Sequence, residues 1–217
     1  MTRTIVCYGD SNTHGADPAG GERLPREVRW PGVMRAALGA GYEIIEEGLS
    51  GRNTVWDSPL APHRNGLAYL TSCLLSHEPV DLVIIMLGTN DLKRIYGLTA
   101  PEIAGAASVL VDAARQSLAG PGGQPPAVLL VAPVPLGEVT AASELWGFGA
   151  ARDESLKLAR LYRLAAEERG IGFLDAGSVA PISPLDGVHL DAAAHASLGA
   201  ALAEAVRSEL ARAGQVH

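Results

Sequence analysis

The stretch DLVIIML, residues 81–87, is apolar at every position after its first aspartate. A strand that faces water on one side alternates apolar and polar side chains, and this stretch has no polar face. We therefore expect a strand covered on both faces, which is typical of the centre of a parallel sheet with helices packed on either side.

Other runs of strand length lie before and after this stretch: TIVCY at 4–8, YEIIEEG at 42–48, AVLLVA at 127–132 and IGFLD at 171–175. Helical patterns separate them, at residues 30–40, 63–77, 101–118 and 152–169, and a last helix is indicated by the four-residue repeat of Leu198, Leu202, Val206 and Leu210. This alternation predicts an α/β protein, a three-layer α/β/α sandwich with a five-stranded, mostly parallel sheet of flavodoxin-like order 2-1-3-4-5. We expect one domain over residues 1–217.

The composition argues against several classes of protein. The chain is 47% hydrophobic and 19% charged, as globular chains are. Its formal charge of −7 is spread along the chain without a basic stripe, so we expect no nucleic-acid partner. No uncharged apolar run approaches the roughly twenty residues that span a bilayer, and no leader-like apolar segment follows the first residue. We therefore expect no membrane association and a cytoplasmic protein.

The two cysteines, Cys7 and Cys73, lie in or beside apolar runs. We expect both to be buried free thiols rather than disulfide partners or nucleophiles. The sequence has no C-x-x-C pattern. The group His189, Asp191 and His195 crosses a predicted helix start and lacks standard ligand spacing, so we expect no metal site.

Polar and glycine-rich segments follow the predicted strands. They are GDSNTHG at 9–15, GLSGRNT at 48–54, LGTNDLK at 87–93 and, after a short loop beyond the fifth strand, DGVHLD at 186–191. Ligands of open α/β sheets bind outside the carboxyl ends of the strands. We therefore expect these segments, distant in sequence, to form one site.

Three of these residues suggest nucleophilic chemistry. A neutral histidine, with a pKa of about 6.5, can take a proton from a serine hydroxyl. Ser11 lies on a tight turn after the first strand, and His189 is the candidate base. Asp186 would hold the ring of His189 in the correct tautomer. The alternative is structural: Ser11 as a turn residue and Asp191 as the cap of the last helix.

An acyl-transfer site also needs donors for a developing oxyanion. The candidates are the backbone N–H groups of Ser11 and Gly51 and the side-chain amide of Asn90. Gly51 as a turn glycine and Asn90 as a helix cap are the structural alternatives, although Asp91 is the better cap candidate. The neighbouring Arg52 has no role that the sequence assigns.

The loop after the fourth strand, at residues 133–149, contains Trp146 and Phe148. Exposed aromatic side chains there would line an acyl or alcohol pocket, whereas the alternative is that they anchor the loop or form a subunit contact. His14 lacks a nearby acid to orient it, so we expect it to be a pocket wall rather than a base.

The four polar segments, in this order, resemble the blocks of the SGNH (GDSL) hydrolase superfamily. Further stretches resemble its arylesterase/acyltransferase branch, which includes mycobacterial acyltransferases: VRWPGV at 28–33, YEIIEEGLSGR at 42–52, NGLAYLTSCLLSHEPVDLVIIMLGTNDLK at 65–93 and DAGSV at 175–179. One departure is Asn12, since the first block of the superfamily often has leucine after its serine.

This resemblance implies a carboxylic ester hydrolase that acts on small aryl or alkyl esters through an acyl-enzyme, without a metal or organic cofactor. It implies a Ser11–His189–Asp186 triad, with Ser11, Gly51 and Asn90 as the oxyanion hole. It also implies acyl transfer to alcohols as well as water, and a homo-oligomer whose contacts narrow the entrance to the site.

Three other functions stay open on the sequence alone. A carbohydrate O-deacetylase or a thioesterase of the same superfamily would use the same residues. A non-catalytic α/β ligand-binding protein would carry them without activity. A metal phosphoesterase would depend on an ion that a chelator removes.

Overall fold

The five strands form one parallel sheet in the order β2-β1-β3-β4-β5, so the predicted fold class and strand order are confirmed. The computed structural model describes residues 2–213. The strands are β1 (Arg3–Gly9), β2 (Tyr42–Gly48), β3 (Leu82–Met86), β4 (Ala127–Ala132) and β5 (Gly172–Asp175). All five coincide with the predicted runs to within a few residues.

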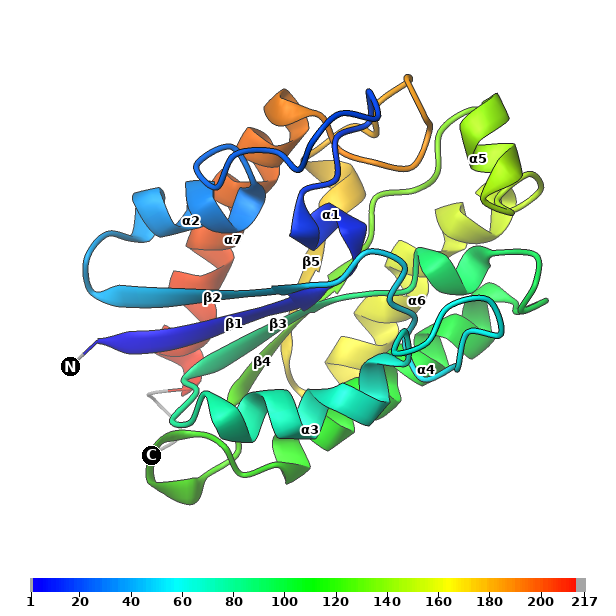
Figure 1. Cartoon of the computed structure of the whole chain (residues 1–217). Helices are drawn as coiled ribbons and strands as arrows, with labels where there is room; N and C mark the ends of the chain where they lie inside the picture. Colours follow the sequence, from blue (N-terminus) through cyan, green and yellow to red (C-terminus); the bar gives the residue numbers. More distant parts are fainter. Residues whose placement is uncertain (1, 214–217) are drawn as a thin grey trace.

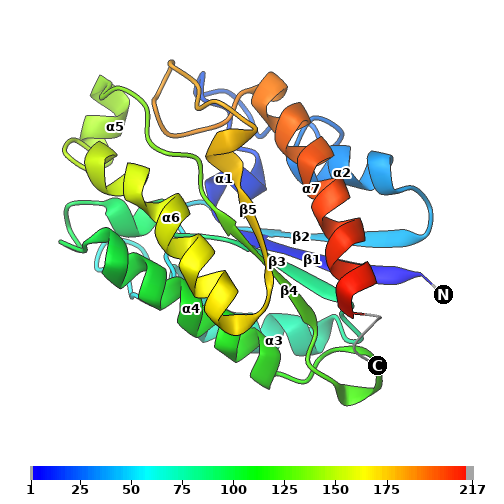
Figure 2. The ribbon, with the colours of Figure 1, turned by 180° about the vertical axis from the view of Figure 1, so that it is seen from behind.

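Helices cover both faces of the sheet (Figures 1 and 2). Helices α2 (Trp30–Leu38) and α7 (Ala192–Ala213) pack on one face, whereas α3 (Gly66–Ser76), α4 (Ala100–Gln116) and α6 (Arg152–Arg169) pack on the other. Two short helices, α1 (Ser11–His14) and α5 (Ala141–Leu145), lie beyond the carboxyl ends of the strands. Three turns of 3₁₀ helix complete the described elements: η1 (Asn90–Leu92), η2 (Pro121–Gly123) and η3 (Ala176–Ser178).

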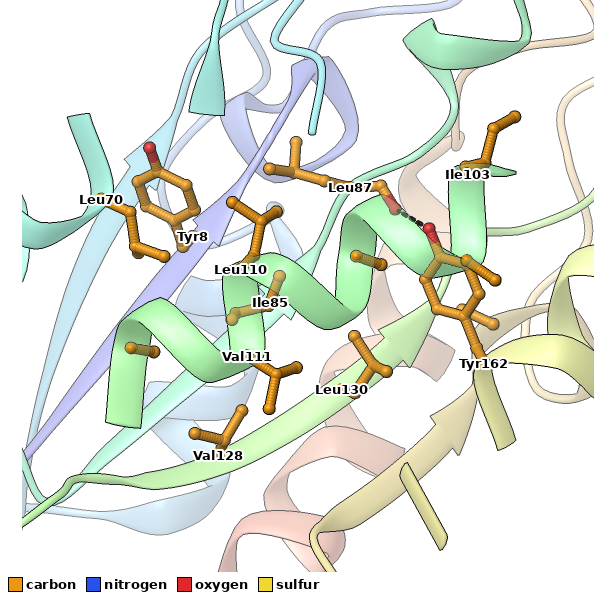
Figure 3. Close-up of a cluster of buried hydrophobic side chains, with 14 of the residues drawn as sticks. Tyr8, Leu70, Ile85, Leu87, Ile103, Leu110, Val111, Val128, Leu130 and Tyr162 are labelled. Carbon is orange, nitrogen blue, oxygen red and sulfur yellow. Dashed lines mark hydrogen bonds between the residues drawn. The ribbon is translucent and has the colours of Figure 1, made fainter. Parts of the chain in front are cut away.

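The central strand β3 is buried on both faces, as its apolar sequence predicts. On the side of α3, α4 and α6, Ile85 and Leu87 pack into a cluster that Figure 3 shows. Burying one such side chain stabilises the fold by about 1.5–3 kcal/mol. In the same cluster the Tyr162 hydroxyl donates a hydrogen bond to the backbone oxygen of Leu87 at 2.8 Å, which joins α6 to the end of β3.

The two cysteines lie on opposite faces of the sheet. Cys7 packs with α2 and α7, and Cys73 packs with the helices of the other face. Both thiols are free and buried, as predicted, and burial raises the pKa of Cys73 to about 12. Within the described residues, none of the helices combines the length and the apolar character that a bilayer crossing requires.

Candidate active site

The register of the sheet brings three of the polar segments together. Gly9 pairs with Gly48 of β2 on one side and with Met86 of β3 on the other. The chain therefore leaves three neighbouring strands at the same edge, and the segments that begin at Asp10, Leu49 and Leu87 lie next to one another. This is the predicted convergence at the carboxyl ends of the strands.

A tight turn presents Ser11 at this edge. A Cβ atom on Gly9 would lie 2.0 Å from Thr13 Oγ1 and 2.9 Å from the backbone oxygen of Met86, so only glycine fits there. Asp10 precedes α1 and accepts a hydrogen bond from the Asn12 N–H at 2.9 Å, so its side chain caps the start of this helix. Ser11 is the first residue of α1 and is 7% exposed.

Ser11, His189 and Asp186 form a continuous hydrogen-bonded chain. His189 Nε2 lies 2.9 Å from Ser11 Oγ, and His189 Nδ1 lies 2.6 Å from Asp186 Oδ2. The other Asp186 oxygen accepts the N–H groups of Val188 and His189, both at 2.9 Å. Burial acts to raise the pKa of Asp186, but these hydrogen bonds outweigh it and hold the pKa below its ordinary value. The carboxylate is therefore ionised and can accept a hydrogen bond from the Nδ1–H group of His189.

Asn12 joins the turn at Ser11 to the segment that contains His189. Its Nδ2 donates to the backbone oxygen of Val188 at 3.1 Å, and its Oδ1 accepts the N–H of Leu190 at 3.0 Å. The amide thus holds the peptide units on both sides of His189. Sequence reasoning missed this role, although a polar side chain directly after Ser11 was a signal for it.

The three candidate oxyanion donors belong to the segments that follow β1, β2 and β3 at this edge of the sheet. The N–H of Ser11 is at the first position of a helix, where no intrahelical acceptor exists. Gly51 has a φ of 81°, a left-handed conformation that favours glycine. Asn90 is 4% exposed, and its Nδ2 donates to the backbone oxygen of Arg52 at 3.1 Å. Asn90 Nδ2 also lies 3.5 Å from Asp10 Oδ2, the longest distance at which it can donate a hydrogen bond to that oxygen, so its second hydrogen is only weakly engaged.

Arg52 and Asp91 hold the segments that carry Gly51 and Asn90 in place. Arg52 is buried, stacks 4.2 Å from the Tyr8 ring centroid, and donates to the backbone oxygens of Gly9 and Glu47. Asp91 does not cap a helix as expected; its carboxylate accepts the N–H of Thr54 at 3.1 Å and the Thr54 hydroxyl. Burial raises the pKa of Asp91 to about 6, although the hydrogen bonds from Thr54 act against it.

Two cavities share Trp146 on their walls, and His189 lines the first of them. The first, of about 450 Å³, carries several polar side chains on its wall, among them His14, Asp17, Arg23 and Ser50. The second, of about 360 Å³, is lined by Gly51, by apolar side chains such as Leu60, Ile95 and Leu145, and by the cationic Arg64 and Lys93. Trp146 lines both cavities, and its ring meets the His189 ring edge-on with centroids 5.5 Å apart. His14 and Trp146 thus lie where the sequence analysis expected pocket walls.

The profile of the GDSL-like lipase/acylhydrolase family matches residues 7–197. The chain belongs to this family. The match extends from β1 to α7 and includes all four polar segments, which accords with the resemblance seen in the sequence.

Solved structures of similar chains have the same fold as this GDSL-like chain. The native aryl esterase of M. smegmatis is 44% identical, with a TM-score of 0.91, over 96% of this chain and 100% of that one. A carbohydrate acetylesterase from Sinorhizobium meliloti is 41% identical, with a TM-score of 0.89, over 95% of this chain and 99% of that one. A curated acetylxylan esterase of Xylanibacter ruminicola is 29% identical over 143 residues, 60% of this chain, and the chain spans 28% of the length of that relative.

The expectation that Phe148 is exposed and lines a pocket is wrong for this GDSL-like protein. It is 4% exposed and packs in the hydrophobic cluster, with Lys93 Nζ 5.3 Å from its ring centroid. The chain turns at Gly147, which has a φ of 90°, and Phe148 returns to the core beneath the loop while Trp146 stays at the surface. The loop at 133–149 also contains α5, which the sequence did not reveal.

His189, Asp191 and His195 do not gather into a close group of ligand atoms in the structure. His189 is engaged by Asp186, and the fully buried His195 accepts the N–H of Trp30 on Nδ1 at 3.2 Å. Burial lowers the pKa of His195 to about 4, so its ring is neutral. Within the described residues of this GDSL-like chain, the side chains grouped closely enough to share a metal ion lie elsewhere, between β2 and α3.

Proposed function

We propose that the protein is a serine esterase that hydrolyses small aryl or alkyl esters through an acyl-enzyme. One observation carries the proposal: the unbroken chain from Asp186 through His189 to Ser11, with separations of 2.6 and 2.9 Å. Three residue types that can form a nucleophile, a base and an orienting acid are in contact at the rim where the family's polar segments meet.

In the acylation step, Ser11 Oγ attacks the ester carbonyl carbon and its proton passes to His189 Nε2. Asp186 stabilises the imidazolium that forms. The negative charge on the carbonyl oxygen is met by the N–H groups of Ser11 and Gly51 and by the Asn90 amide. Loss of one such donor commonly costs about 10²–10³-fold in kcat.

The tetrahedral intermediate collapses when the bond to the alcohol oxygen breaks and His189 gives that oxygen its proton. The alcohol leaves, and the acyl group remains on Ser11. Water then attacks the acyl carbon while His189 takes its proton, and the return of that proton to Ser11 Oγ releases the acid. An alcohol in place of water would yield a new ester.

The test of the nucleophile is Ser11→Ala. We expect the variant to fold and to lose both the burst of p-nitrophenol from p-nitrophenyl acetate and covalent labelling by a fluorophosphonate probe. Ser50→Ala, which changes an exposed serine on the wall of the cavity that His189 lines, is the control and should keep the label. Turnover by Ser11→Ala, or labelling that depends on another serine, would refute the assignment. Absence of label in the unchanged protein would favour the non-catalytic alternative.

A second candidate is that the ester is an O-acetyl group on a carbohydrate. The wall of the larger cavity carries His14, Asp17, Arg23 and Ser50, which can form hydrogen bonds with a hydroxyl-rich alcohol. Two of the similar proteins are named as acetylesterases of carbohydrates or xylan. A panel of acetylated xylose derivatives, aryl acetates and acyl thioesters separates the candidates, and kcat/KM highest on a thioester would exclude both of the ester proposals.

The proposal includes acyl transfer to an alcohol. The cavity beside Gly51 would admit an alcohol, and product analysis with an added alcohol in water should show the new ester as well as the acid.

The proposal also includes self-association of the chain. Leu60 and Leu145 around this cavity are 82% and 84% exposed, which favours contact with another copy of the chain. Light scattering should show a homo-oligomer that Leu145→Glu weakens; a monomer at all concentrations would contradict it.

A further inference from the structure

Three side chains that the proposed reaction does not use meet between the edge strand β2 and helix α3. They are Glu47, Cys73 and His77, and their oxygen, sulfur and nitrogen atoms all lie within 4.8 Å of one another. In the part of the chain that the structure describes, this is the only group of three or more His, Cys, Asp or Glu side chains whose ligand atoms lie close enough together for one ion to bridge them.

Two rigid elements hold these groups in place. Cys73 lies in α3, and His77 directly follows the last residue of that helix. A spacing of four residues places two side chains on the same face, one turn apart. Glu47 is the next-to-last residue of β2 and is paired with Tyr8 of β1. The third group thus comes from a different layer of the fold, which is why the sequence pattern did not reveal the cluster.

The cluster is closed on one side and open on the other. The Cys73 side chain is completely buried against the core. The side chains of Glu47 and His77 are 19% and 30% exposed, and His77 Nε2 lies 3.0 Å from Glu47 Oε1. Solvent can therefore reach the cluster past the carboxylate and the imidazole, which gives an ion a way in and a water molecule a place to bind.

We propose that Glu47, Cys73 and His77 form a binding site for a divalent transition-metal ion, and that Zn²⁺ fits its ligand chemistry best. Thiolate, imidazole and carboxylate are the groups that bind zinc in proteins, with bonds of about 2.3 Å to sulfur and about 2.0 Å to nitrogen and oxygen. Around a tetrahedral ion, such bonds separate the ligand atoms by about 3.3–3.6 Å. That separation lies between the 3.0 Å of the Glu47–His77 pair and the 4.8 Å limit of the cluster.

The charges of the site balance those of the ion. When the metal–sulfur bond forms, the thiol proton leaves to water, and the thiolate and carboxylate together neutralise a dication. The neutral imidazole adds a nitrogen lone pair, and water takes the fourth position. The nearby Arg52 does not compete for the carboxylate, because its guanidinium stacks on the Tyr8 ring and donates to backbone oxygens of Gly9 and Glu47.

An ion at this position would tie the sheet to its covering helix. Strand β2 is the edge of the sheet and pairs with β1 alone. The cluster would add a link from β2 to α3. An ion that binds the folded chain more tightly than the unfolded chain raises the Tm in a concentration-dependent way.

The direct test uses the full chain after removal of metal by a chelator. Zn²⁺ is titrated by calorimetry, and Co²⁺ is titrated by absorption spectroscopy. We expect one equivalent of either ion to bind, with a thiolate-to-cobalt charge-transfer band in the near ultraviolet. Cys73→Ala should abolish the band, whereas Cys7→Ala, which removes the other buried thiol on the opposite face of the sheet, should keep it.

Because Cys73→Ala also alters the core, His77→Gln at the partly exposed helix end provides a second test. It should weaken zinc binding by at least about 100-fold, since it removes a direct ligand. Loss of a residue that only hydrogen-bonds a ligand already lowers metal affinity by about 10–100-fold. It should also abolish the rise in Tm with zinc. Overturning results are the absence of saturable binding, a cobalt spectrum without the thiolate band, or zinc affinity in His77→Gln equal to that of the unchanged chain.

Discussion

At the scale of single residues, Asn12 connects the turn at Ser11 to the segment around His189. Its amide group bonds the peptide units before and after His189, through Val188 O and Leu190 N. Asp186 bonds the same segment through the His189 ring and two backbone N–H groups. The position of the imidazole relative to Ser11 thus depends on two side chains, of which one directly follows Ser11.

We predict that Asn12→Leu lowers kcat by about 10-fold or more while KM changes little, because two hydrogen bonds worth about 1 kcal/mol each position His189. Steady-state kinetics on a p-nitrophenyl ester measure the two constants separately. Val206→Ala is the control, since it removes buried methyl groups in α7 far from the site and should lower stability without lowering kcat. Equal losses of kcat in both variants would mean that Asn12 acts through general stability only.

The buried His195 predicts a dependence of stability on pH. Its pKa is about 4 in the folded chain and about 6.5 in the unfolded chain, so only the unfolded chain gains a proton as the pH falls between these values. The free energy of unfolding should therefore decrease from pH 6.5 toward pH 4, by up to about 3 kcal/mol from this group.

Urea denaturation at pH 7 and pH 5 measures this loss. Asp91, with a pKa raised to about 6, contributes with the opposite sign in the same range, because its folded form takes up a proton first. The informative quantity is therefore the difference between the unchanged chain and His195→Asn, whose side-chain oxygen can still accept the Trp30 N–H. A variant with the same pH dependence as the unchanged chain would contradict the prediction.

At the scale of elements, the contact between α6 and β3 positions the segment that carries Asn90. The Tyr162 hydroxyl is buried and donates to Leu87 O at 2.8 Å, and a Cβ on the adjacent Gly88 would lie 2.3 Å from that hydroxyl. The chain after β3 therefore passes so close to the Tyr162 ring that no residue larger than glycine fits at position 88.

We predict that Tyr162→Phe lowers the free energy of unfolding by about 1–3 kcal/mol, because a buried carbonyl loses its partner. Urea denaturation should show a lower midpoint with an unchanged slope. Tyr69→Phe, at a tyrosine that is 44% exposed, is the matched control and should change stability by less than about 0.5 kcal/mol. Equal midpoints for the two variants would show that the buried hydrogen bond contributes nothing.

The long elements were predictable from the sequence and the short ones were not. Helix α6 is long enough for its apolar residues to show a period, and strand β3 is recognised by an unbroken apolar run. Helices α1 and α5 have 4 and 5 residues, less than two turns, so no period can develop. For the same reason the direction of Phe148 could not be read, since it depends on the turn at Gly147 rather than on any pattern of neighbours.

At the scale of the whole molecule, the parallel register explains why the candidate site could be located from the sequence. Gly9, Gly48 and Met86 end adjacent strands at one level, so residues that follow them must meet. The separations among Ser11, His189 and Asp186 could not be predicted, because they depend on how the segment before α7 folds back over the sheet.

A cluster of charges joins the segment before α2 to the sheet. The Glu46 carboxylate, on the edge strand β2, lies near four guanidinium groups. That of Arg29 is nearest, at 2.9 Å, and Arg23 also lines the cavity on which His189 lies. The other two are those of Arg26 and Arg35. The Glu46 carboxylate thus links Arg23, on the wall of that cavity, to strand β2.

We predict that Glu46→Gln lowers the free energy of unfolding by about 2 kcal/mol, because the positive charges of the four arginines then face one another without the carboxylate. This loss is smaller than the roughly 3–5 kcal/mol that follows removal of one partner from a fully buried ion pair. Thermal and urea denaturation measure the change, and added salt should reduce it. Glu43→Gln, on the same strand but exposed, is the control and should have little effect. Indifference of stability to Glu46→Gln would show that the arginines are held by other means.

The position of Trp146 bears on the proposed function. Ser11 follows a strand that is paired on both sides, whereas Trp146 follows a short helix outside the sheet, and its side chain lines both cavities. On the proposed function, replacement of this ring by a smaller or larger side chain would change which esters fit while Ser11, His189 and Asp186 keep their places. Substrate preference in such a fold would then change without any change in the residues that are proposed to react.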